Sequence, residues 1–256
     1  MNQRQIITAV ESAANQLRID TTKLMPELIA ECKQINWIYN PLDYAWLSHR
    51  EWIRRFCGNG AKILLVGMNP GHGMGNTGIP FGCPEQVRNF LNIKHLFVGQ
   101  PSSQHPKRPV LGLQCRKPEI SGRRIWSFLS QRYGSADDVS RQIFVINHCP
   151  LWMFNQDGKN ITPDKLTGSV VEKLTSICNH HLQTVVEVMN IQDVIGVGRY
   201  AEKQAVSLFK NTKITVDWVP HPSPASPFAN RNGGVDWQKA FSIVLDKKDI
   251  GFELTC

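Results

Sequence analysis

Short apolar runs alternate with longer segments of helical periodicity along most of this chain, and that alternation restricts the fold more than any other feature. Four runs have the composition of buried strands: Lys62 to Val66, Ile143 to Asn147, Asp193 to Val197 and Ile214 to Val219. Helical spacing of apolar residues marks the segments Ser121 to Arg132, Val170 to Met189, Tyr200 to Phe209 and Val235 to Leu245. This order predicts a three-layer α/β/α fold with a central, mainly parallel, four-stranded sheet and functional groups at the carboxyl ends of its strands.

The chain before the first strand is predicted to be helical. Residues 4 to 33 carry apolar side chains at helical spacing and predict two helices, with Thr21 or Thr22 as a possible N-cap. Asp43 to Cys57 predicts a further helix. The Gly- and Pro-rich stretch from Gly67 to Pro84 is predicted to be a loop.

No internal repeat or low-complexity linker divides the sequence. We therefore expect residues 1–256 to form a single domain, with an N-terminal helical extension at about residues 1–35. The first residues lack the apolar core of a signal peptide, and no uninterrupted apolar run exceeds four residues. Neither secretion nor a membrane span is expected.

The cysteines and histidines do not form a recognisable metal or disulfide pattern. The seven cysteines are an odd number without any C-x-x-C pair, which argues against a zinc ribbon, an iron–sulfur site and a disulfide scaffold, and favours reduced thiols in an intracellular protein. His148, His180 and His181 have no third ligand at metal spacing, and no H-E-x-x-H occurs. We expect neither a metal nor another cofactor.

The chain is basic, with 29 Lys and Arg against 21 Asp and Glu, or a net charge of +8, which favours a polyanionic partner. Between residues 107 and 132, a single acid, Glu119, accompanies seven basic residues: Lys107, Arg108, Arg116, Lys117, Arg123, Arg124 and Arg132. This cluster predicts a surface that tracks phosphates and binds more weakly as salt rises. The alternative is a solvated helix face with its flanking loop.

Three of the predicted strands end in polar sequences with special backbone properties. These are Gly67-Met68-Asn69-Pro70-Gly71, Asn147-His148-Cys149-Pro150 and His221-Pro222-Ser223-Pro224. Because the carboxyl ends of parallel strands meet at one edge of a sheet, the three segments are expected in one crevice. Taken singly, each is as readily an ordinary turn.

A nucleotide-phosphate loop is a poor interpretation of the glycines that follow the first strand. Gly71-x-Gly73-x-Gly75 lacks both the Lys of a phosphate loop and the G-x-G-x-x-G spacing of a dinucleotide site. Pro70 and Pro80 also remove backbone N–H groups that such a loop uses.

The combined motifs resemble the uracil-DNA glycosylase superfamily, and in particular its single-strand-selective monofunctional branch. The likeness runs from about Ile38 to about Phe241 and rests on the three strand-end segments together with Thr77-Gly78-Ile79-Pro80-Phe81-Gly82. Further similar stretches are Tyr39-Asn40-Pro41, Tyr44-Ala45-Trp46, His105-Pro106-Lys107-Arg108-Pro109-Val110-Leu111-Gly112-Leu113 and Gly196-Val197-Gly198-Arg199. The resemblance implies the fold of that superfamily.

The resemblance also implies two catalytic residues. Asn69 would position the water that attacks the sugar, and His221 would donate a hydrogen bond to uracil O2 as negative charge develops on the leaving base. An amide is no strong base, so the role of Asn69 would be orientation. A neutral imidazole suffices as the donor.

Base recognition is implied for a second set of residues. Phe81 would stack on the extruded base, and Asn147 would pair with its O4/N3 edge, which rejects cytosine. Met68, Gly71 and Met74 are expected in the substrate pocket, with the backbone of Gly71 and Met74 facing uracil C5 through a water. Four of these site residues have plainer alternative roles. Phe81 and Met74 would be packing residues, Asn147 would cap a turn, and His221 would be a structural histidine.

The sequence departs from the family pattern in two places. The loop Gly71-His72-Gly73-Met74 is one residue shorter than usual, and Ala225 stands where relatives commonly carry the Arg of a duplex wedge. Phe228 or Arg231 is expected to take over as the wedge, with reduced efficiency on duplex DNA. The candidate DNA contacts are Ser223, Ala225, Phe228, Arg231, Lys107 and Arg108.

The sequence as a whole predicts a monofunctional DNA glycosylase that removes uracil and 5-hydroxymethyluracil from single- and double-stranded DNA and so initiates base-excision repair. Strand cleavage is not expected, because no lysine stands at the motifs to form a Schiff base. The expected protein is a nuclear monomer whose partner is DNA, without membrane association. Two competing hypotheses are a catalytically weak nucleic-acid binder that senses bases without excising them, and a metal-free hydrolase of free nucleosides.

Overall fold

A four-stranded parallel sheet forms the centre of the molecule. The computed structural model describes residues 1–93 and 97–248. The strand order is β3-β2-β6-β7, and the strands are β2 (Ile63–Gly67), β3 (Ile143–Asn147), β6 (Asp193–Val197) and β7 (Thr215–Val219). The pairing is parallel throughout, with Gly67 opposite Asn147 and Val197 opposite Val219. The predicted central sheet is confirmed.

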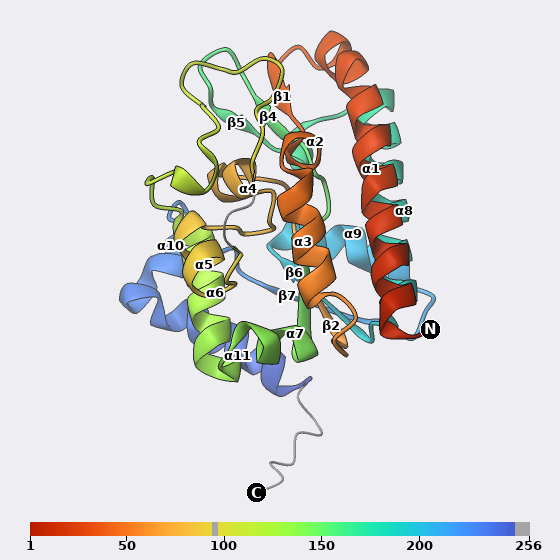
Figure 1. Cartoon of the computed structure of the whole chain (residues 1–256), viewed down its shortest axis with the longest axis vertical. Coiled ribbons are helices and arrows are strands. Elements are labelled where there is room, and N and C mark those ends of the chain that lie inside the picture. Colours follow the sequence, from red (N-terminus) through yellow and green to blue (C-terminus); the bar gives the residue numbers. More distant parts are fainter. Residues whose placement is uncertain (94–96, 249–256) are drawn as a thin grey trace, which may run out of the picture.

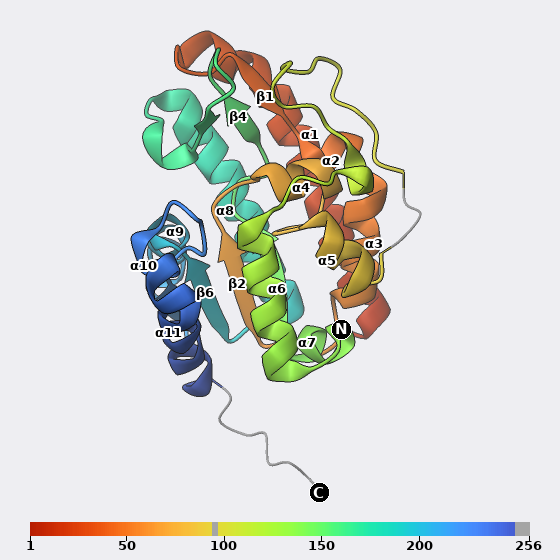
Figure 2. The same cartoon turned by 90° about the vertical axis from the view of Figure 1, so that its left-hand side faces the viewer.

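Helices cover both faces of this sheet, which gives the predicted three layers. In Figures 1 and 2, α1, α8 and α9 lie on one side and α6 and α11 on the other. The longer helices are α1 (Gln3–Glu31), α3 (Trp46–Phe56), α6 (Ile120–Tyr133), α8 (Ser169–Met189), α9 (Arg199–Phe209) and α11 (Val235–Asp246). The shorter ones are α2 (Pro41–Tyr44), α4 (His72–Thr77), α5 (Pro84–Asn89), α7 (Ala136–Gln142) and α10 (Pro227–Asn230), with 3₁₀ turns at Gly112–Gln114, Pro163–Lys165 and Arg231–Gly234.

Aromatic side chains fill the space between the helices and the sheet. Trp52 of α3 stacks on Phe144 of β3 with ring centroids 5.5 Å apart, and its edge meets Trp126 of α6 at 5.6 Å. Within the layer of α6 and α11, Phe128 of α6 stacks on Phe241 of α11 at 4.6 Å. These contacts fix α3, α6 and α11 against the sheet.

The N-terminal segment forms the single helix α1, where the sequence predicts two. Thr21, expected as a cap, is buried, and its hydroxyl donates to the Leu17 carbonyl one turn earlier at 2.7 Å. Pro26 also lies inside the helix. The prediction of two helices is wrong because packing against α8 outweighs these local signals.

Three further boundaries differ from the prediction. The stretch from Gly67 to Pro84 contains the helix α4, which ends at Gly78 in a left-handed conformation, so it is not wholly a loop. The helix predicted from Asp43 to Cys57 is broken at Ala45. Helix α6 begins at Ile120 and is capped by the carboxylate of Glu119, whereas the sequence predicts a helix that starts with Ser121 as its N-cap.

A second, antiparallel sheet was not predicted. It consists of β1 (Trp37–Tyr39), β4 (Trp152–Phe154) and β5 (Asn160–Ile161), in the order β1-β4-β5. Its strands are two or three residues long, too short to show a periodicity. Among the described residues, no helix is long and apolar enough to cross a membrane.

Three histidines are buried between the layers and stay neutral. His49 donates through Nδ1 to the Gly78 carbonyl at 2.8 Å, and His148 Nε2 lies 2.8 Å from Asn179 Oδ1. Burial lowers the pKa of His49 and of His148 to about 4, and that of His181 to about 3. Desolvation of the charged ring causes each shift.

We expect the free energy of unfolding to decrease as the pH falls from about 6.5 toward 4, because the unfolded chain then binds protons that the buried rings do not. Each histidine contributes about 1.4 kcal/mol per pH unit in this window. Urea unfolding at pH 7.5, 6 and 5 measures the effect. His181→Gln should flatten the pH dependence, and His180→Gln, exposed on the same helix, is the matched control. A constant free energy across the window contradicts the prediction.

Candidate active site

A single cavity of about 350 Å³ lies at the carboxyl ends of the parallel strands. Its wall contains eight of the residues that the sequence singles out: Met68, Asn69, Gly71, Met74, Phe81, Asn147, His221 and Ser223. They come from the segments that follow β2, β3 and β7. The cavity has the volume of a site for a small organic group such as a nucleobase.

Glycine at position 67 lets the two recognition candidates approach the end of β2. A Cβ atom on Gly67 would lie 2.2 Å from Asn147 Oδ1 and 2.9 Å from the ring of Phe81. Both distances are shorter than van der Waals contact. Any side chain here would displace the amide or the ring from the cavity.

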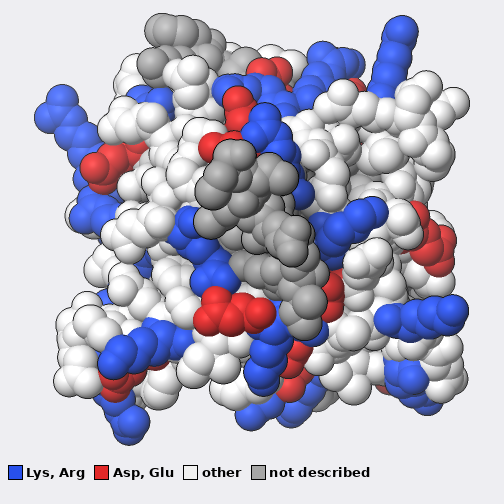
Figure 3. All heavy atoms as spheres, turned by 90° about the horizontal axis from the view of Figure 1, so that it is seen from below, with Lys and Arg blue, Asp and Glu red and all other residues white. Residues whose placement is uncertain are grey.

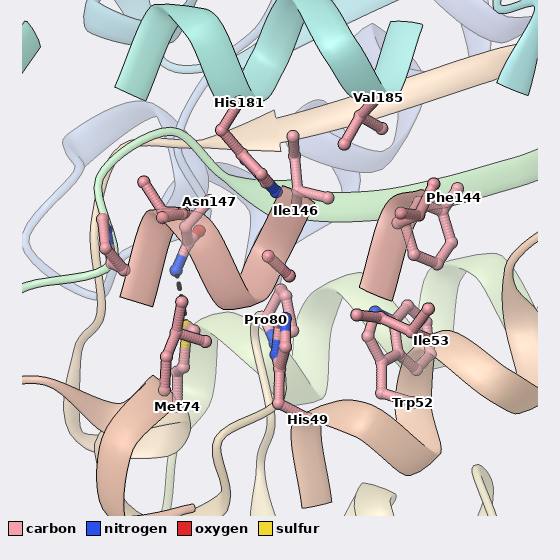
Figure 4. A pocket seen from close by; sticks show the side chains of 15 residues that line it. His49, Trp52, Ile53, Met74, Pro80, Phe144, Ile146, Asn147, His181 and Val185 are labelled. Atoms are coloured by element: carbon pink, nitrogen blue, oxygen red, sulfur yellow. Dashed lines mark hydrogen bonds between the residues drawn. The ribbon is translucent and has the colours of Figure 1, made fainter. Parts of the chain in front are cut away.

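Asn147 is buried at the floor of the cavity, directly opposite Gly67 in the sheet register. Its Nδ2 donates to the thioether sulfur of Met74 at 3.1 Å. Figure 4 marks this bond and shows Asn147 facing Met74. The amide therefore has a fixed plane and offers one donor and one acceptor side by side.

A smaller cavity of about 20 Å³ lies behind the recognition residues, toward α1 and α8. His49, Trp52 and His181 line it together with Asn147 and other core side chains (Figure 4). A space of this size holds about one water molecule. The floor of the large cavity is thus supported by a nearly close-packed core.

Phe81 has an unusual backbone conformation. Its φ is +51°, in the left-handed region that a bulky residue rarely adopts. The indole nitrogen of Trp126 donates to the Phe81 carbonyl at 3.0 Å, and the Cys83 N–H donates to the same oxygen at 2.8 Å. These bonds hold the strained turn, and strain of this kind clusters at functional sites.

Asn69 is oriented by the segment that follows β3. Its Nδ2 donates to the Leu151 carbonyl at 3.2 Å. Because the nitrogen is engaged there, the carbonyl oxygen Oδ1 is the atom that can accept a hydrogen bond from a water in the cavity.

His221 lines the same cavity, with its ring centroid 6.3 Å from that of Phe81. Burial lowers the pKa of His221 to about 4, so the ring is neutral at physiological pH. The Ser223 N–H donates to Nδ1 at 3.1 Å. Since Nδ1 accepts, the proton of the neutral ring is on Nε2, which can then donate to a ligand.

Four lining residues were not predicted: Glu119, Ser121, Asn160 and Thr162. Glu119 could have been singled out from the sequence, because it is the one acidic residue within the basic segment 107–132. Burial raises the pKa of its carboxyl, which the N–H groups of Ser121 and Gly122 counter in part. Asn160 and Thr162 lie on and beside β5 and had no signal, because that strand has only two residues.

The predicted DNA contacts lie outside the cavity, except for Ser223. Ala225 and Phe228 are in the segment after His221, and the guanidinium of Arg231 lies over the Phe228 ring at 5.7 Å. Lys107 is exposed. Arg108 instead donates to the Gly158 carbonyl at 2.6 Å, so part of its hydrogen-bonding capacity is used within the protein.

Much of the predicted basic cluster has partners within the protein. Arg123 pairs with Glu85 at 2.7 Å and Arg132 with Asp246 at 2.6 Å. Lys107, Arg116 and Lys117 are exposed and are the better candidates for phosphate contacts. Seen from below, Lys and Arg side chains are spread over the face, with fewer Asp and Glu side chains among them (Figure 3).

The described residues hold no group of three or more His, Cys, Asp or Glu side chains placed to bind a metal ion. The polar and aromatic groups of the cavity are three amides, a neutral imidazole, an aromatic ring, a carboxyl and hydroxyls. Such a set can orient a polar planar ligand and stabilise developing negative charge by hydrogen bonding.

Gly67→Ala should destabilise the fold by about 1–3 kcal/mol, because the added methyl group overpacks the contact between Asn147 and Phe81. Gly71→Ala is the matched control, since a Cβ there has nothing within 4 Å. Its effect should stay within about 0.5 kcal/mol. Chemical denaturation of both variants measures the difference, and equal stabilities would contradict the assigned contact.

Comparison with known proteins identifies the family. The sequence profile of the Uracil DNA glycosylase superfamily matches residues 54–242. The single-strand selective monofunctional uracil-DNA glycosylase of Rattus norvegicus is 41% identical over 206 residues, 79% of this chain and 72% of the relative. Those of Bos taurus and Mus musculus are 41% and 40% identical over 76% and 79% of this chain, and each is covered to 72%.

The fold has a solved counterpart as well. A crystal structure of wild-type SMUG2 from Pedobacter heparinus aligns with a TM-score of 0.59 at 20% sequence identity, over 83% of this chain and 88% of the other. At that identity the likeness concerns the fold alone. On the sequence matches, this chain belongs to the uracil-DNA glycosylase superfamily and, within it, to the single-strand-selective monofunctional uracil-DNA glycosylases.

Proposed function

We propose that this protein is a monofunctional DNA glycosylase that hydrolyses the N-glycosidic bond of uracil, and of 5-hydroxymethyluracil, in single- and double-stranded DNA. The observation that carries the proposal is the convergence of Asn69, Phe81, Asn147 and His221 on one cavity. The names of the relatives support uracil as the base. The product is an abasic site, so the protein would initiate base-excision repair, and we infer a nuclear location from that substrate.

Recognition follows from the fixed groups of the cavity. An extruded uracil would stack on Phe81 and present its O4/N3 edge to Asn147, whose amide offers the complementary donor and acceptor. Cytosine carries the opposite pattern and would leave a buried group unpaired, at a cost of about 1–3 kcal/mol. The backbone at Gly71 and Met74, which lines the same cavity, would then face a substituent on C5.

Bond cleavage needs stabilisation of opposite charges on the sugar and the base. The C1′–N1 bond breaks with its electron pair going to uracil, and His221 Nε2–H donates to O2, where part of that charge gathers. A water held by Asn69 Oδ1 attacks C1′ and loses a proton to solvent. Among the described residues, no lysine lines the cavity, so the proposed chemistry ends at hydrolysis without a Schiff base.

A base-sensing protein without catalysis is the alternative function. It would use Phe81 and Asn147 in the same way, but it has no need of the oriented amide of Asn69 or of a neutral donor at His221. Hydrogen bonds orient both the Asn69 amide and the His221 ring toward such roles, which favours an enzyme over a base-sensing protein. Hydrolysis of free nucleosides is disfavoured, because the exposed cations Lys107, Arg116 and Lys117 would then have no partner.

Asn69→Ala and His221→Ala should each slow uracil excision by about 10²-fold or more, because each removes one preorganised hydrogen bond to the transition state. The measurement is single-turnover kinetics on a single-uracil oligonucleotide in EDTA, with alkali to cleave abasic sites. His180→Ala, exposed on α8, is the control and should retain the wild-type rate. Wild-type rates in both variants would refute the assignment, and strand breaks before alkali would indicate lyase activity.

The wild-type enzyme should excise uracil more slowly from duplex DNA than from a single strand of the same sequence, because Ala225 cannot fill the gap left by the flipped base. Ala225→Arg should increase the duplex rate and leave the single-strand rate within about twofold. Matched single-turnover assays on both substrates test this. Equal wild-type excision rates on duplex and single-stranded DNA would show that Ala225 does not limit excision from duplex DNA.

A further inference from the structure

We propose that Arg124 is a positioning residue that holds His221 at the cavity by fastening the backbone immediately after it. This inference rests on the function proposed above for His221. Arg124 belongs to the basic cluster that the sequence assigns to phosphate contacts. Its contacts in the fold indicate a different use.

The guanidinium of Arg124 joins both ends of the segment that follows β7. Its Nη1 donates to the Pro222 carbonyl and its Nη2 to Asn230 Oδ1, each at 2.9 Å. Asn230 in turn donates through Nδ2 to the Pro224 carbonyl at 2.7 Å. Arg124 therefore holds the Pro222 carbonyl directly and the Pro224 carbonyl through Asn230.

Two other contacts hold this segment from outside: the Trp237 indole donates to the Pro220 carbonyl, before His221, at 2.7 Å, and Ala229 is buried in the core. The carbonyl immediately after His221 is held by Arg124. Pro222 and Pro224 lack the N–H groups with which a turn would normally be held. The bonds inside the segment, such as Ser226 N–H to the Ser223 carbonyl at 2.9 Å, close a local turn but do not attach it to the rest of the protein. The Arg124 bonds attach it to α6.

Helix α6 also holds the segment that contains Phe81, the proposed stacking residue of the base site. The indole of Trp126, two residues after Arg124, holds the Phe81 carbonyl at 3.0 Å. The same helix therefore holds Phe81 through Trp126 and the segment after His221 through Arg124. Arg124 thereby sets the separation between the stacking ring and the imidazole, 6.3 Å between centroids.

The neighbouring arginine differs in both exposure and partners. Arg123 is exposed and pairs with Glu85 at 2.7 Å, an exposed ion pair of small energetic effect. Arg124 is half-buried and uses two nitrogens of its planar fork on two separate acceptors. A lysine ammonium cannot reproduce that geometry.

The test compares Arg124→Ala, Arg124→Lys and Arg123→Ala with the wild-type enzyme. Single-turnover uracil excision at saturating enzyme reports the chemical step, and fluorescence anisotropy with a thymine-containing oligonucleotide of the same sequence reports DNA binding and its salt dependence. We expect Arg124→Ala to lower excision 10- to 100-fold, Arg124→Lys to recover less than threefold of that loss, and Arg123→Ala to stay within twofold. The salt slope of binding should be the same for Arg124→Ala and the wild type.

Asn230→Ala keeps the proposal testable if Arg124→Ala folds poorly, because Asn230 is exposed. It should reduce excision by an intermediate factor, and combining it with Arg124→Ala should cause no further loss, as for two members of one network. Additive losses would overturn the proposal, as would full rescue by Arg124→Lys. Unchanged excision with a salt slope reduced by about 0.7 would show a phosphate contact instead.

The two proposals fail in different ways. A wild-type protein without uracil excision would refute the proposed function itself. An active wild type with equally active Arg124 and Asn230 variants would refute only the positioning role.

Discussion

The approach of Asn147 and Phe81 over the missing side chain of Gly67 is the contact on which the candidate site depends. Parallel pairing of β2 with β3 sets Gly67 opposite Asn147, and the absence of a Cβ lets the amide and the ring occupy the same end of the sheet. Asn69 and His221 line the same cavity as that pair. The proposed recognition of a planar base would therefore depend on the register of two strands and on one glycine.

Helix α6 gives the site its rigidity from the other side. Its N-terminus brings Glu119 to the cavity, Trp126 holds the strained turn at Phe81, and Arg124 fastens the backbone beyond His221. The basic segment is thus partly structural, because four of its seven cations have partners within the protein. Burial keeps His221 neutral, because a charged ring would lose its solvation by water. The neutral ring can still donate a hydrogen bond.

Sequence reasoning predicted the central sheet and most of the cavity, but not all of its wall. Asn69, Asn147 and His221 could be found because each lies at the carboxyl end of a strand or within two residues of it, and parallel strands end at one edge. Asn160 and Thr162 could not, since β5 is too short to leave a pattern. Local signals also failed where long-range packing outweighed them, as in α1, which continues past residues that suggest a break.

The sequence by itself determined the order of the strands and of the polar motifs at their ends, the family likeness, and the residue types that are proposed to orient water and to donate to a base. These are properties of residue types and their spacing, which local physical chemistry specifies. Only the tertiary structure decided that Gly67 makes room for two side chains, that Nδ1 of His221 accepts and leaves Nε2 to donate, and that Arg124 serves the protein and not DNA. Each depends on which distant group lies within hydrogen-bond reach, and the order of residues alone does not specify that distance.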